Sequence, residues 1–420
     1  MISRRAFVRG TLSAGLLSLG GCMVRPRAAR VVVIGGGFGG ASAARALKRL
    51  DPSLEVTLIE PKETYVACPF SNLVLSGDRE LSAQTFSYQA LTREGILLLP
   101  KRALGIDPVS RIVDLDGATQ VGYDRLILAP GISLNYEALP GYSAAVSEQL
   151  PHAWQAGAQT EILRSQLEAM RNGGLVALSI PENPYRCPPG PYERASLIAR
   201  YLKKHKPRSK ILLLDAKDRF SKQNLFKAAW QSQFPGMIEW QGRADGAIVV
   251  EVEAEPRTLK TDFDTVRPDV ANVIPPQRAG DIALTSGLAD STGWCPVDAL
   301  SFESRLANNI HVIGDAAILN AMPKSAFSAN AQAKLCAVQV VRLLKDLAPL
   351  DATLANTCYS LINPDYGISV AGVYQAEGSR WVSQPGAGGV SPNNVSYDFR
   401  RKEALYAKDW FNNITRQTFL

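Results

Sequence analysis

A glycine-rich segment near the N-terminus restricts the fold of this chain more than any other feature. Five of the six residues at 35–40 are glycine, and they follow an apolar run at 30–34 that is typical of a buried parallel strand. Glycines after such a strand permit a tight turn and let a pyrophosphate approach the backbone where the next helix begins. The pattern predicts a unit that binds a dinucleotide, with Gly35, Gly37 and Gly40 as binding residues.

The following strand carries an acid at the spacing that such a unit needs. We expect a helix over 41–50 and a second strand over 55–60, which ends in Glu60. Glu60 comes twenty residues after Gly40, where a carboxylate can accept hydrogen bonds from ribose hydroxyls. A glycine-rich turn in an unrelated fold is the alternative, but the strand, the helix and the acid all occur in the expected order.

Length and composition restrict the other possibilities. At about 150 residues per domain, a chain of 420 residues predicts two or three domains. The formal net charge is +7, but no basic run is interleaved with aromatic residues, so we expect no nucleic-acid partner. The six cysteines show neither zinc-knuckle spacing nor a Cys-x-x-Cys-His haem motif. We therefore expect no metal site and no haem attached to this chain.

The first residues are typical of an export signal. Arg4 and Arg5 form a twin-arginine pair, and a short apolar stretch follows them. Because this route exports folded proteins, we expect the cofactor to be bound first, residues 1–29 to be removed and the protein to work in the periplasm. Cys22 lies in a lipobox-like sequence, so its acylation would anchor the chain to a membrane. Cleavage at the end of the segment, which discards Cys22, is the alternative.

Two later strands resemble those of a known group of flavoproteins. Residues 123–131 and 310–316 each form an apolar strand that ends in a tight turn. They resemble the FAD-binding segments of the glutathione-reductase-like flavoproteins, which have two dinucleotide-binding domains. The resemblance implies an α/β fold with two Rossmann-like domains and FAD as cofactor, with Gly131 beside it and Asp315 bonded to its ribityl chain. A helix that begins near 328–330 would direct its positive end at the flavin.

The domain organisation follows from the same resemblance. In the second domain, strands at 174–180 and 210–215 flank a proline-rich segment where the group carries a glycine turn for NAD. Prolines prevent close approach of a pyrophosphate, so we expect this domain to have lost the nicotinamide. A C-terminal α+β domain contains an alternating segment at 368–374 and an aromatic tail, used for association or packed in the core. The expected divisions are 1–29 for the signal, 30–149 with 271–349 for FAD, 150–270 for the second domain and 350–420 for the interface domain.

Segments around four of the cysteines carry a closer resemblance. They resemble the flavoprotein subunit of flavocytochrome c sulfide dehydrogenase and the related flavoprotein of sulfur-oxidation gene clusters. The matching segments span nearly the whole chain after the signal and lie at 65–72, 186–193, 274–280, 293–298 and 356–359.

This resemblance assigns roles to individual residues. It implies that Cys187 and Cys358 form a redox disulfide that hydrosulfide attacks, and that Cys68 attaches FAD covalently. Glu193 follows Cys187 closely and would move protons if burial raises its pKa. The alternatives are a purely structural bridge between Cys187 and Cys358, an inert thiol at Cys68 and a surface salt bridge at Glu193. Cys295 and Cys336 are expected to pack in the core.

The implied activity is the oxidation of a small inorganic sulfur compound by FAD, with electrons passing to haem c on a partner cytochrome subunit. Two alternatives remain open. One is an accessory flavoprotein that reactivates a thiosulfate-oxidising system. The other is sulfide:quinone oxidoreductase, which needs an apolar quinone slot and a C-terminal helix that binds the membrane. Because the tail after residue 400 is short and rich in charges, we expect membrane contact only if Cys22 carries a lipid.

Overall fold

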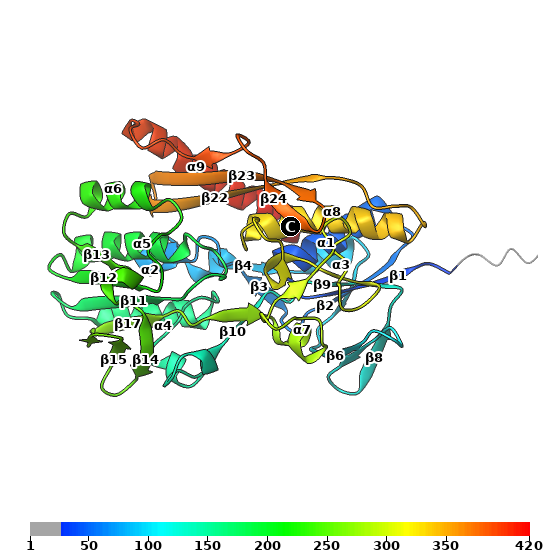
Figure 1. The fold of residues 1–420 in the computed structure, drawn as a ribbon, viewed down its shortest axis with the longest axis horizontal. Helices are drawn as coiled ribbons and strands as arrows, with labels where there is room; N and C mark the ends of the chain where they lie inside the picture. Colours follow the sequence, from blue (N-terminus) through cyan, green and yellow to red (C-terminus); the bar gives the residue numbers. More distant parts are fainter. Residues whose placement is uncertain (1–26) are drawn as a thin grey trace, which may run out of the picture.

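The computed structural model describes residues 27–420, so Arg4, Arg5, Cys22 and most of the expected signal lie outside the described residues. Figure 1 shows two α/β units side by side, with the C-terminal strands and helix α9 lying across both. Each unit contains a parallel sheet, as the sequence predicts.

The first unit is built on a five-stranded parallel sheet. Its strands lie in the order β20-β9-β1-β2-β5. Helices α1 (Phe38–Leu50) and α8 (Ala326–Leu343) pack together over one face. Because the sheet is covered, Val31 and Val33 are fully buried, and the strands are apolar throughout. The strands are β1 (Arg30–Ile34), β2 (Glu55–Ile59), β5 (Leu97–Leu99), β9 (Arg125–Leu128) and β20 (Ile310–Val312).

The second unit contains a four-stranded parallel sheet in the order β13-β12-β11-β17. The chain enters this unit through β10 (Ile132–Leu134) and leaves it through β18 (Gln277–Ala279), which pair antiparallel. The sheet and its helices are β11 (Leu175–Ile180), β12 (Lys210–Asp215), β13 (Ile238–Gln241), β17 (Val270–Val273), α4 (Ala158–Ala169), α5 (Gly190–His205) and α6 (Gln223–Gln233).

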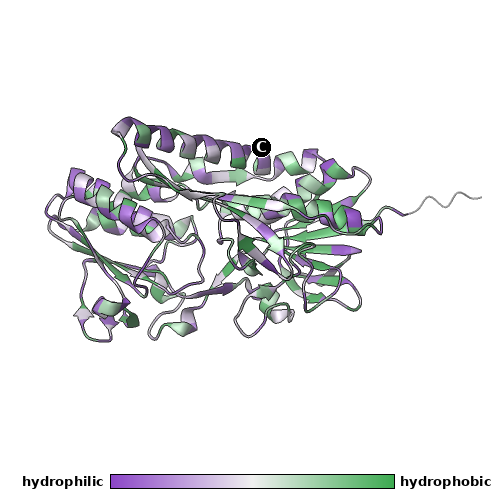
Figure 2. Ribbon diagram, turned by 45° about the horizontal axis from the view of Figure 1, so that its top comes forward, coloured by the Kyte–Doolittle hydropathy of each residue, from purple (hydrophilic) through white to green (hydrophobic). Residues whose placement is uncertain are grey.

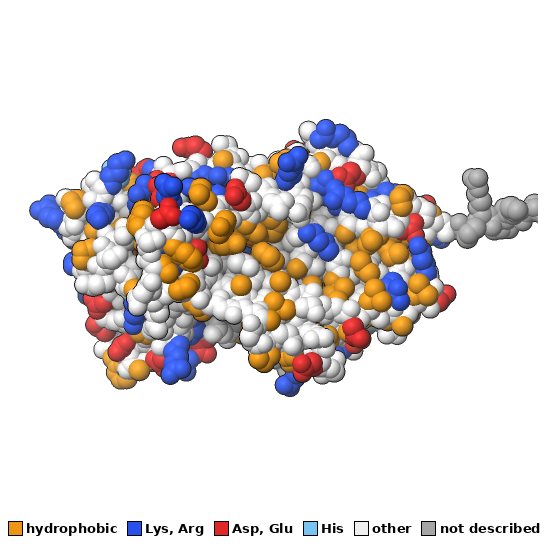
Figure 3. Space-filling view, turned by 90° about the horizontal axis from the view of Figure 1, so that it is seen from above, with side chains coloured by type: hydrophobic (Ala, Val, Ile, Leu, Met, Phe, Trp, Pro, Cys, Tyr) orange, Lys and Arg blue, Asp and Glu red, His pale blue; other side chains and the backbone are white. Residues whose placement is uncertain are grey.

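The C-terminal layer joins the two units. Strands β22 (Thr353–Asn363) and β23 (Tyr366–Glu377) form a long hairpin, which β24 (Arg380–Ser383) and β25 (Gly389–Val390) extend. Strand β22 packs against α5 of the second unit and α8 of the first. Helix α9 (Tyr397–Phe419) closes the layer. Figure 3 shows this face, where hydrophobic side chains gather across the middle and basic side chains surround them.

Shorter elements complete the two units. Figure 2 shows that the central strands are mainly hydrophobic, whereas the outer helices carry both kinds of residue. None of the helices formed by residues 27–420 combines the length and the apolar composition that crossing a bilayer requires. The remaining helices and strands are α2 (Asn72–Ser76), α3 (Gln89–Arg93), α7 (Asp281–Thr285), β3 (Thr64–Val66), β4 (Thr85–Ser87), β6 (Ala103–Asp107), β7 (Ile112–Leu115), β8 (Thr119–Gly122), β14 (Val249–Glu253), β15 (Thr258–Thr261), β16 (Thr265–Val266), β19 (Cys295–Pro296) and β21 (Ala317–Ile318).

Candidate functional site

A pocket of about 370 Å³ lies where the two units and the C-terminal layer meet. Its size is in the range of sites for small molecules and cofactors. Every residue to which the sequence assigned a binding or catalytic role lines this pocket, except Gly40. These residues are Gly35, Gly37, Glu60, Cys68, Gly131, Cys187, Glu193, Asp315 and Cys358.

The glycine turn between β1 and α1 forms one end of the pocket. Gly35 has a φ of +100°, and a Cβ there would lie 2.3 Å from the carbonyl oxygen of Ala129. A Cβ on Gly40 would lie 1.8 Å from the carbonyl oxygen of Gly35, so a glycine here lets the helix pack closely against the strand. Gly40 is not among the residues that line the pocket. The assignment of Gly40 as a binding residue stays a prediction. Helix α1 also begins earlier than predicted, at Phe38.

Glu60 is held beside this turn. Its carboxylate accepts hydrogen bonds from the backbone N–H groups of Gly36 at 2.8 Å and Lys62 at 3.1 Å. The Tyr88 hydroxyl donates to the Gly36 carbonyl oxygen at 3.1 Å. These bonds fix the turn and the acid as one rigid group, which is the arrangement that recognition of a ribose and a pyrophosphate requires.

Asp315 supplies a test of whether the pocket fits FAD. It follows β20, and its buried Oδ1 atom has no hydrogen-bond partner among the described residues. Burial raises the pKa of Asp315, while the cations Arg186 and Lys324 oppose this shift. A buried acceptor without a donor is costly, and a hydroxyl of a bound cofactor would supply that donor. The glycine turn, Glu60 and Asp315 together therefore fit the pyrophosphate, ribose and ribityl groups of FAD.

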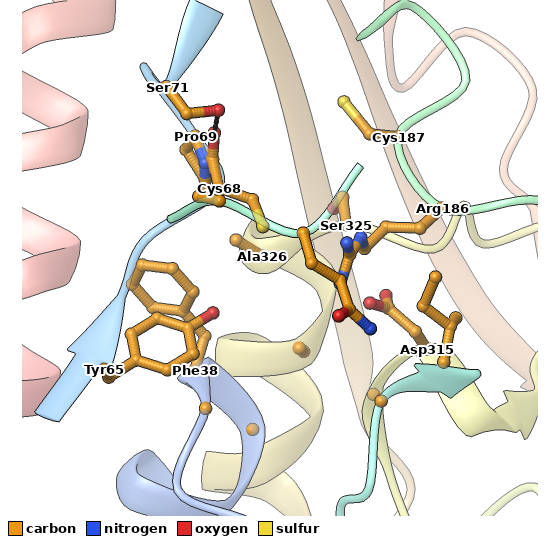
Figure 4. A pocket seen from close by; sticks show the side chains of 18 of the residues that line it. Phe38, Tyr65, Cys68, Pro69, Ser71, Arg186, Cys187, Asp315, Ser325 and Ala326 are labelled. Carbon is orange, nitrogen blue, oxygen red and sulfur yellow. Dashed lines mark hydrogen bonds between the residues drawn. The ribbon is translucent and has the colours of Figure 1, made fainter. Parts of the chain in front are cut away.

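Cys68 faces the pocket from a loop that is firmly held. The Gln84 side chain donates to the carbonyl oxygens of Ala67 at 2.8 Å and Pro69 at 2.6 Å. The Ser71 hydroxyl donates to the carbonyl oxygen of Cys68 at 2.7 Å (Figure 4). The Cys68 side chain is half-buried and lines the pocket. Its position differs from that of an inert core thiol. By contrast, Cys295 and Cys336 are fully buried, as expected for thiols that pack in the core.

Cys187 and Cys358 line the same pocket from different parts of the chain. Cys187 lies in the loop before α5 with a φ of +59°, and its N–H donates to the Lys324 carbonyl oxygen at 2.9 Å. Burial raises the pKa of the Cys187 thiol, and the neighbouring Cys358 raises it further. Cys358 lies on β22, where the side-chain amide of Asn356 donates to its sulfur at 3.3 Å. Both side chains are free thiols in this structure.

Glu193 lies in the first turn of α5 and is bound by two donors. The Asn72 side-chain amide donates to one carboxylate oxygen at 2.9 Å, and the Leu361 N–H donates to the other at 2.8 Å. Burial raises the pKa of Glu193, although these hydrogen bonds and nearby cations oppose the shift. The carboxylate lines the pocket, so the surface salt bridge that the sequence left open is wrong.

Two of the cations near Cys187, Arg186 and Lys222, were given no role from the sequence. Figure 4 shows the Arg186 side chain directed across the pocket toward Cys68, with Asp315 beside it, and its guanidinium donates to the Trp154 carbonyl oxygen. Because Arg186 directly precedes Cys187 in the sequence, its place near the site could have been predicted. Lys222 precedes α6 and is buried, and its ammonium donates to the Cys358 carbonyl oxygen and the Ser360 hydroxyl, both at 2.8 Å. No motif in the sequence marks Lys222.

In the second unit, the acid at the end of the second strand is held by other side chains. Asp215 ends β12, the position of a ribose-binding acid in such a unit. Its carboxylate accepts hydrogen bonds from the Tyr192 hydroxyl at 2.5 Å, the Trp240 indole at 3.0 Å and the Lys217 ammonium at 2.6 Å. The Tyr192 ring also stacks on Phe220, with 3.7 Å between the ring centres. The hydrogen-bonding capacity of this carboxylate is therefore used by side chains of the same chain.

Three family models match the chain. The model described as pyridine nucleotide-disulphide oxidoreductase matches residues 29–171. The central model of the sulfide dehydrogenase (flavocytochrome c) flavoprotein chain matches residues 160–275. The flavin-binding model of flavocytochrome c sulphide dehydrogenase matches residues 350–419.

Individual relatives agree with these matches. The flavoprotein chain of flavocytochrome c sulfide dehydrogenase from Chlorobaculum thiosulfatiphilum is 69% identical over 45 residues, which are 11% of this chain and 94% of that relative. The mitochondrial sulfide:quinone oxidoreductase of Mus musculus is 24% identical over 350 residues, covering 81% of this chain and 77% of the relative.

Solved structures share the fold. The sulfide:quinone oxidoreductase of Aquifex aeolicus has a TM-score of 0.68 at 18% identity, over 93% of this chain and 92% of that one. A ferredoxin reductase from Rhodopseudomonas palustris has a TM-score of 0.64 at 19% identity, over 82% of each chain. These likenesses confirm the predicted α/β fold with two dinucleotide-binding units. Because two family models and the Chlorobaculum relative agree, the chain belongs to the family of the flavoprotein chain of flavocytochrome c sulfide dehydrogenase.

Proposed function

We propose that this chain oxidises hydrosulfide with a bound FAD and passes the electrons to haem c on a partner cytochrome subunit. The observation that carries the proposal is the shared pocket. Cys187 and Cys358 line it together with the glycine turn, Glu60 and Asp315, which fit FAD. A sulfur pair and a two-electron acceptor at one site are the parts that this reaction needs.

The first step is an exchange at sulfur. In the oxidised enzyme, Cys187 and Cys358 form a disulfide. Hydrosulfide attacks one sulfur, so a new S–S bond forms, the bridge breaks and its electron pair remains on the other cysteine as a thiolate. The product is a persulfide, and no electron leaves at this stage. The Asn356 amide, which donates to the Cys358 sulfur, would favour negative charge there.

The oxidation then removes one proton and two electrons from each hydrosulfide, which leaves as zero-valent sulfur while the bridge re-forms. Glu193 is the carboxylate that we assign to this proton, because it lines the pocket and burial raises its pKa, which makes it a better proton acceptor. A bound FAD would supply a two-electron acceptor that can release its electrons one at a time. The chain holds it through the glycine turn, Glu60 and Asp315, and we propose a thioether from Cys68 as a covalent link.

The family supports a cytochrome as the acceptor, since its name pairs the flavoprotein chain with a cytochrome c. The likeness to sulfide:quinone oxidoreductases makes a quinone the second candidate. The third is the accessory flavoprotein of a thiosulfate-oxidising system. We further propose export to the periplasm through Arg4 and Arg5, where c-type cytochromes would be accessible.

The decisive experiment measures sulfide-dependent bleaching of the flavin in the purified wild-type protein and in the C187S and C358S variants. We expect both variants to keep FAD. Their flavin should bleach at least about 10²-fold more slowly than that of the wild type, because neither variant can form the bridge. C295S is the matched control, since Cys295 is buried outside the pocket and its variant should bleach normally. Unchanged bleaching in C187S and C358S would remove the disulfide from the mechanism.

A second measurement identifies the acceptor. Sulfide is added with cytochrome c, with a co-purified haem subunit or with a soluble quinone. Rapid reduction of haem supports the proposal, and rapid reduction of quinone alone replaces the cytochrome by a quinone. Bleaching that is slow with every acceptor supports the accessory role.

A further inference from the structure

The side chain of Lys222 is placed to act on the cysteine pair. Lys222 lies at the start of α6 in the second unit, yet its ammonium reaches β22 in the C-terminal layer. There it donates to the Cys358 carbonyl oxygen and the Ser360 hydroxyl, both at 2.8 Å. Only 6% of the residue is exposed. A lysine that is almost completely buried needs compensation for its lost hydration, so its position calls for a specific reason.

The backbone at Lys222 is also unusual. Its φ is +62°, in the left-handed region that residues other than glycine rarely adopt. Cys187, one member of the cysteine pair, also has a positive φ, of +59°. Residues held in such conformations tend to cluster at functional sites, where the surrounding structure enforces them. Two such residues among the groups around Cys358 indicate that this region is built around a particular arrangement of groups.

The titratable groups that face Lys222 come from several elements. They are the thiols of Cys358 on β22 and Cys187 before α5, and the carboxyl groups of Glu193 on α5 and Glu403 on α9. The ring of Phe226 on its own helix lies 5.8 Å from the ammonium. Burial lowers the pKa of Lys222 to about 8, while these acidic neighbours oppose the shift. The ammonium is therefore present at neutral pH, and a thiolate that forms beside it would keep it protonated to higher pH.

We infer that the Lys222 ammonium is the positioning residue that stabilises the thiolate released when hydrosulfide opens the Cys187–Cys358 bridge. This inference rests on the proposed function. In that step the new S–S bond to hydrosulfide replaces the bridge, and one negative charge remains on a cysteine sulfur. A buried cation close to both cysteines lowers the free energy of that charge, whichever sulfur receives it. Because reduction of the bridge creates the same charge, Lys222 also makes the bridge easier to reduce.

The test uses the purified holoenzyme and reads the cysteines directly. After reduction, the rates at which iodoacetamide alkylates Cys187 and Cys358 are followed by mass spectrometry across pH. The alkylation midpoint is the pH at which the alkylation rate of a thiol reaches half of its maximum. In K222M, we expect this midpoint to rise by about one pH unit for the thiol that reacts faster. The equilibrium constant for reduction of the bridge by glutathione should fall about tenfold at neutral pH, or about 30 mV. K222R keeps the charge and should restore both values toward those of the wild type.

Two controls separate charge from structure. S360A removes one hydrogen bond of Lys222 but keeps the cation, so its alkylation midpoint should not change. Lys217 lies in the same segment between β12 and α6, but its ammonium bonds to Asp215. K217M should therefore also leave the alkylation midpoint unchanged. K222G suits the left-handed backbone and provides a second neutral variant if K222M does not fold. The inference is overturned if the neutral variants keep the wild-type midpoint, or if S360A shifts it as far as they do.

The two proposals fail in different ways. Mass spectrometry of the unreduced wild type reports whether Cys187 and Cys358 are linked. If they are not, the disulfide of the proposed function is wrong, and the alkylation midpoints still decide whether Lys222 stabilises a thiolate. If they are linked and the midpoints do not respond to Lys222, only the inference about Lys222 is wrong.

Discussion

At the scale of single residues, surroundings decide between roles that the sequence leaves open. Glu193 was a candidate because it follows Cys187, but its chemistry depends on donors from Asn72 and Leu361, which are 121 and 168 positions away in the chain. Lys222 reaches Cys358 across 136 positions. Motifs report local spacing, so they found the cysteines and the ribose acid Glu60. They could not find partners that only the folded chain brings together.

The role of Cys68 leads to a prediction about how FAD is retained. If Cys68 forms a thioether, the wild type should keep FAD after acid precipitation, whereas C68S should release it. C68S should still bind FAD in the native state, because the glycine turn, Glu60 and Asp315 would hold the cofactor without a covalent bond. Absorbance of the protein pellet and of the supernatant measures both. Adding D315N to C68S should weaken native binding by about 2 kcal/mol, since it removes the charged acceptor. Release of FAD from the precipitated wild type would refute the covalent link.

At the scale of elements, periodicity predicted some parts well and others not at all. The strand at 210–215 coincides with β12, and the alternating segment at 368–374 lies inside β23. The small antiparallel sheets β6-β7-β8 and β14-β15-β16 were missed. Their strands are short and half-exposed, so they carry only a weak apolar pattern, and pairing with a neighbour supplies most of their stability.

The C-terminal helix shows how an element far along the chain stabilises the cofactor site. Phe419, near the end of α9, is 1% exposed. Its ring stacks on those of Tyr65 and Phe86, with 5.0 and 5.4 Å between ring centres, and meets Phe38 edge-on at 5.4 Å. Tyr65 and Phe38 also line the pocket. Phe411, in the aromatic tail that the sequence singled out, is also buried, at 2% exposed, so packing in the core, one of the two alternatives, holds for this residue.

We therefore predict that F419A destabilises the protein by about 3–5 kcal/mol and weakens retention of FAD, because it leaves a cavity beneath Phe38 and Tyr65. Thermal unfolding and the flavin content after gel filtration measure the two effects. F399A is the matched control, since Phe399 lies on the same helix and is 39% exposed. Its effect on stability should stay within about 0.5 kcal/mol. Equal effects of the two substitutions would contradict the stabilising role of the buried ring.

At the scale of the whole molecule, the site exists only where three parts meet. The first unit supplies the glycine turn and Asp315, the second supplies Cys187 and Glu193, and the C-terminal layer supplies Cys358. The sequence indicated each part through its own motif, and the resemblance to flavoproteins placed them together. Physical reasoning from composition or periodicity alone could not, because the meeting of the three depends on packing between β22 and helices α5 and α8.

This architecture predicts that electrons enter from sulfide and not from a nicotinamide. The second unit has the sheet of a dinucleotide-binding domain, but prolines replace its glycine turn, and the Asp215 carboxylate already accepts hydrogen bonds from Tyr192, Trp240 and Lys217. Under anaerobic conditions, NADH and NADPH should leave the flavin absorbance unchanged, and sulfide should then bleach the same sample. Y192F frees one bond of Asp215 but leaves the prolines in place, so it should remain unresponsive to NADH. Bleaching of the wild type by NADH at a rate near that of sulfide would mean that the second unit still binds the dinucleotide and that the cysteine pair is not the main entry for electrons.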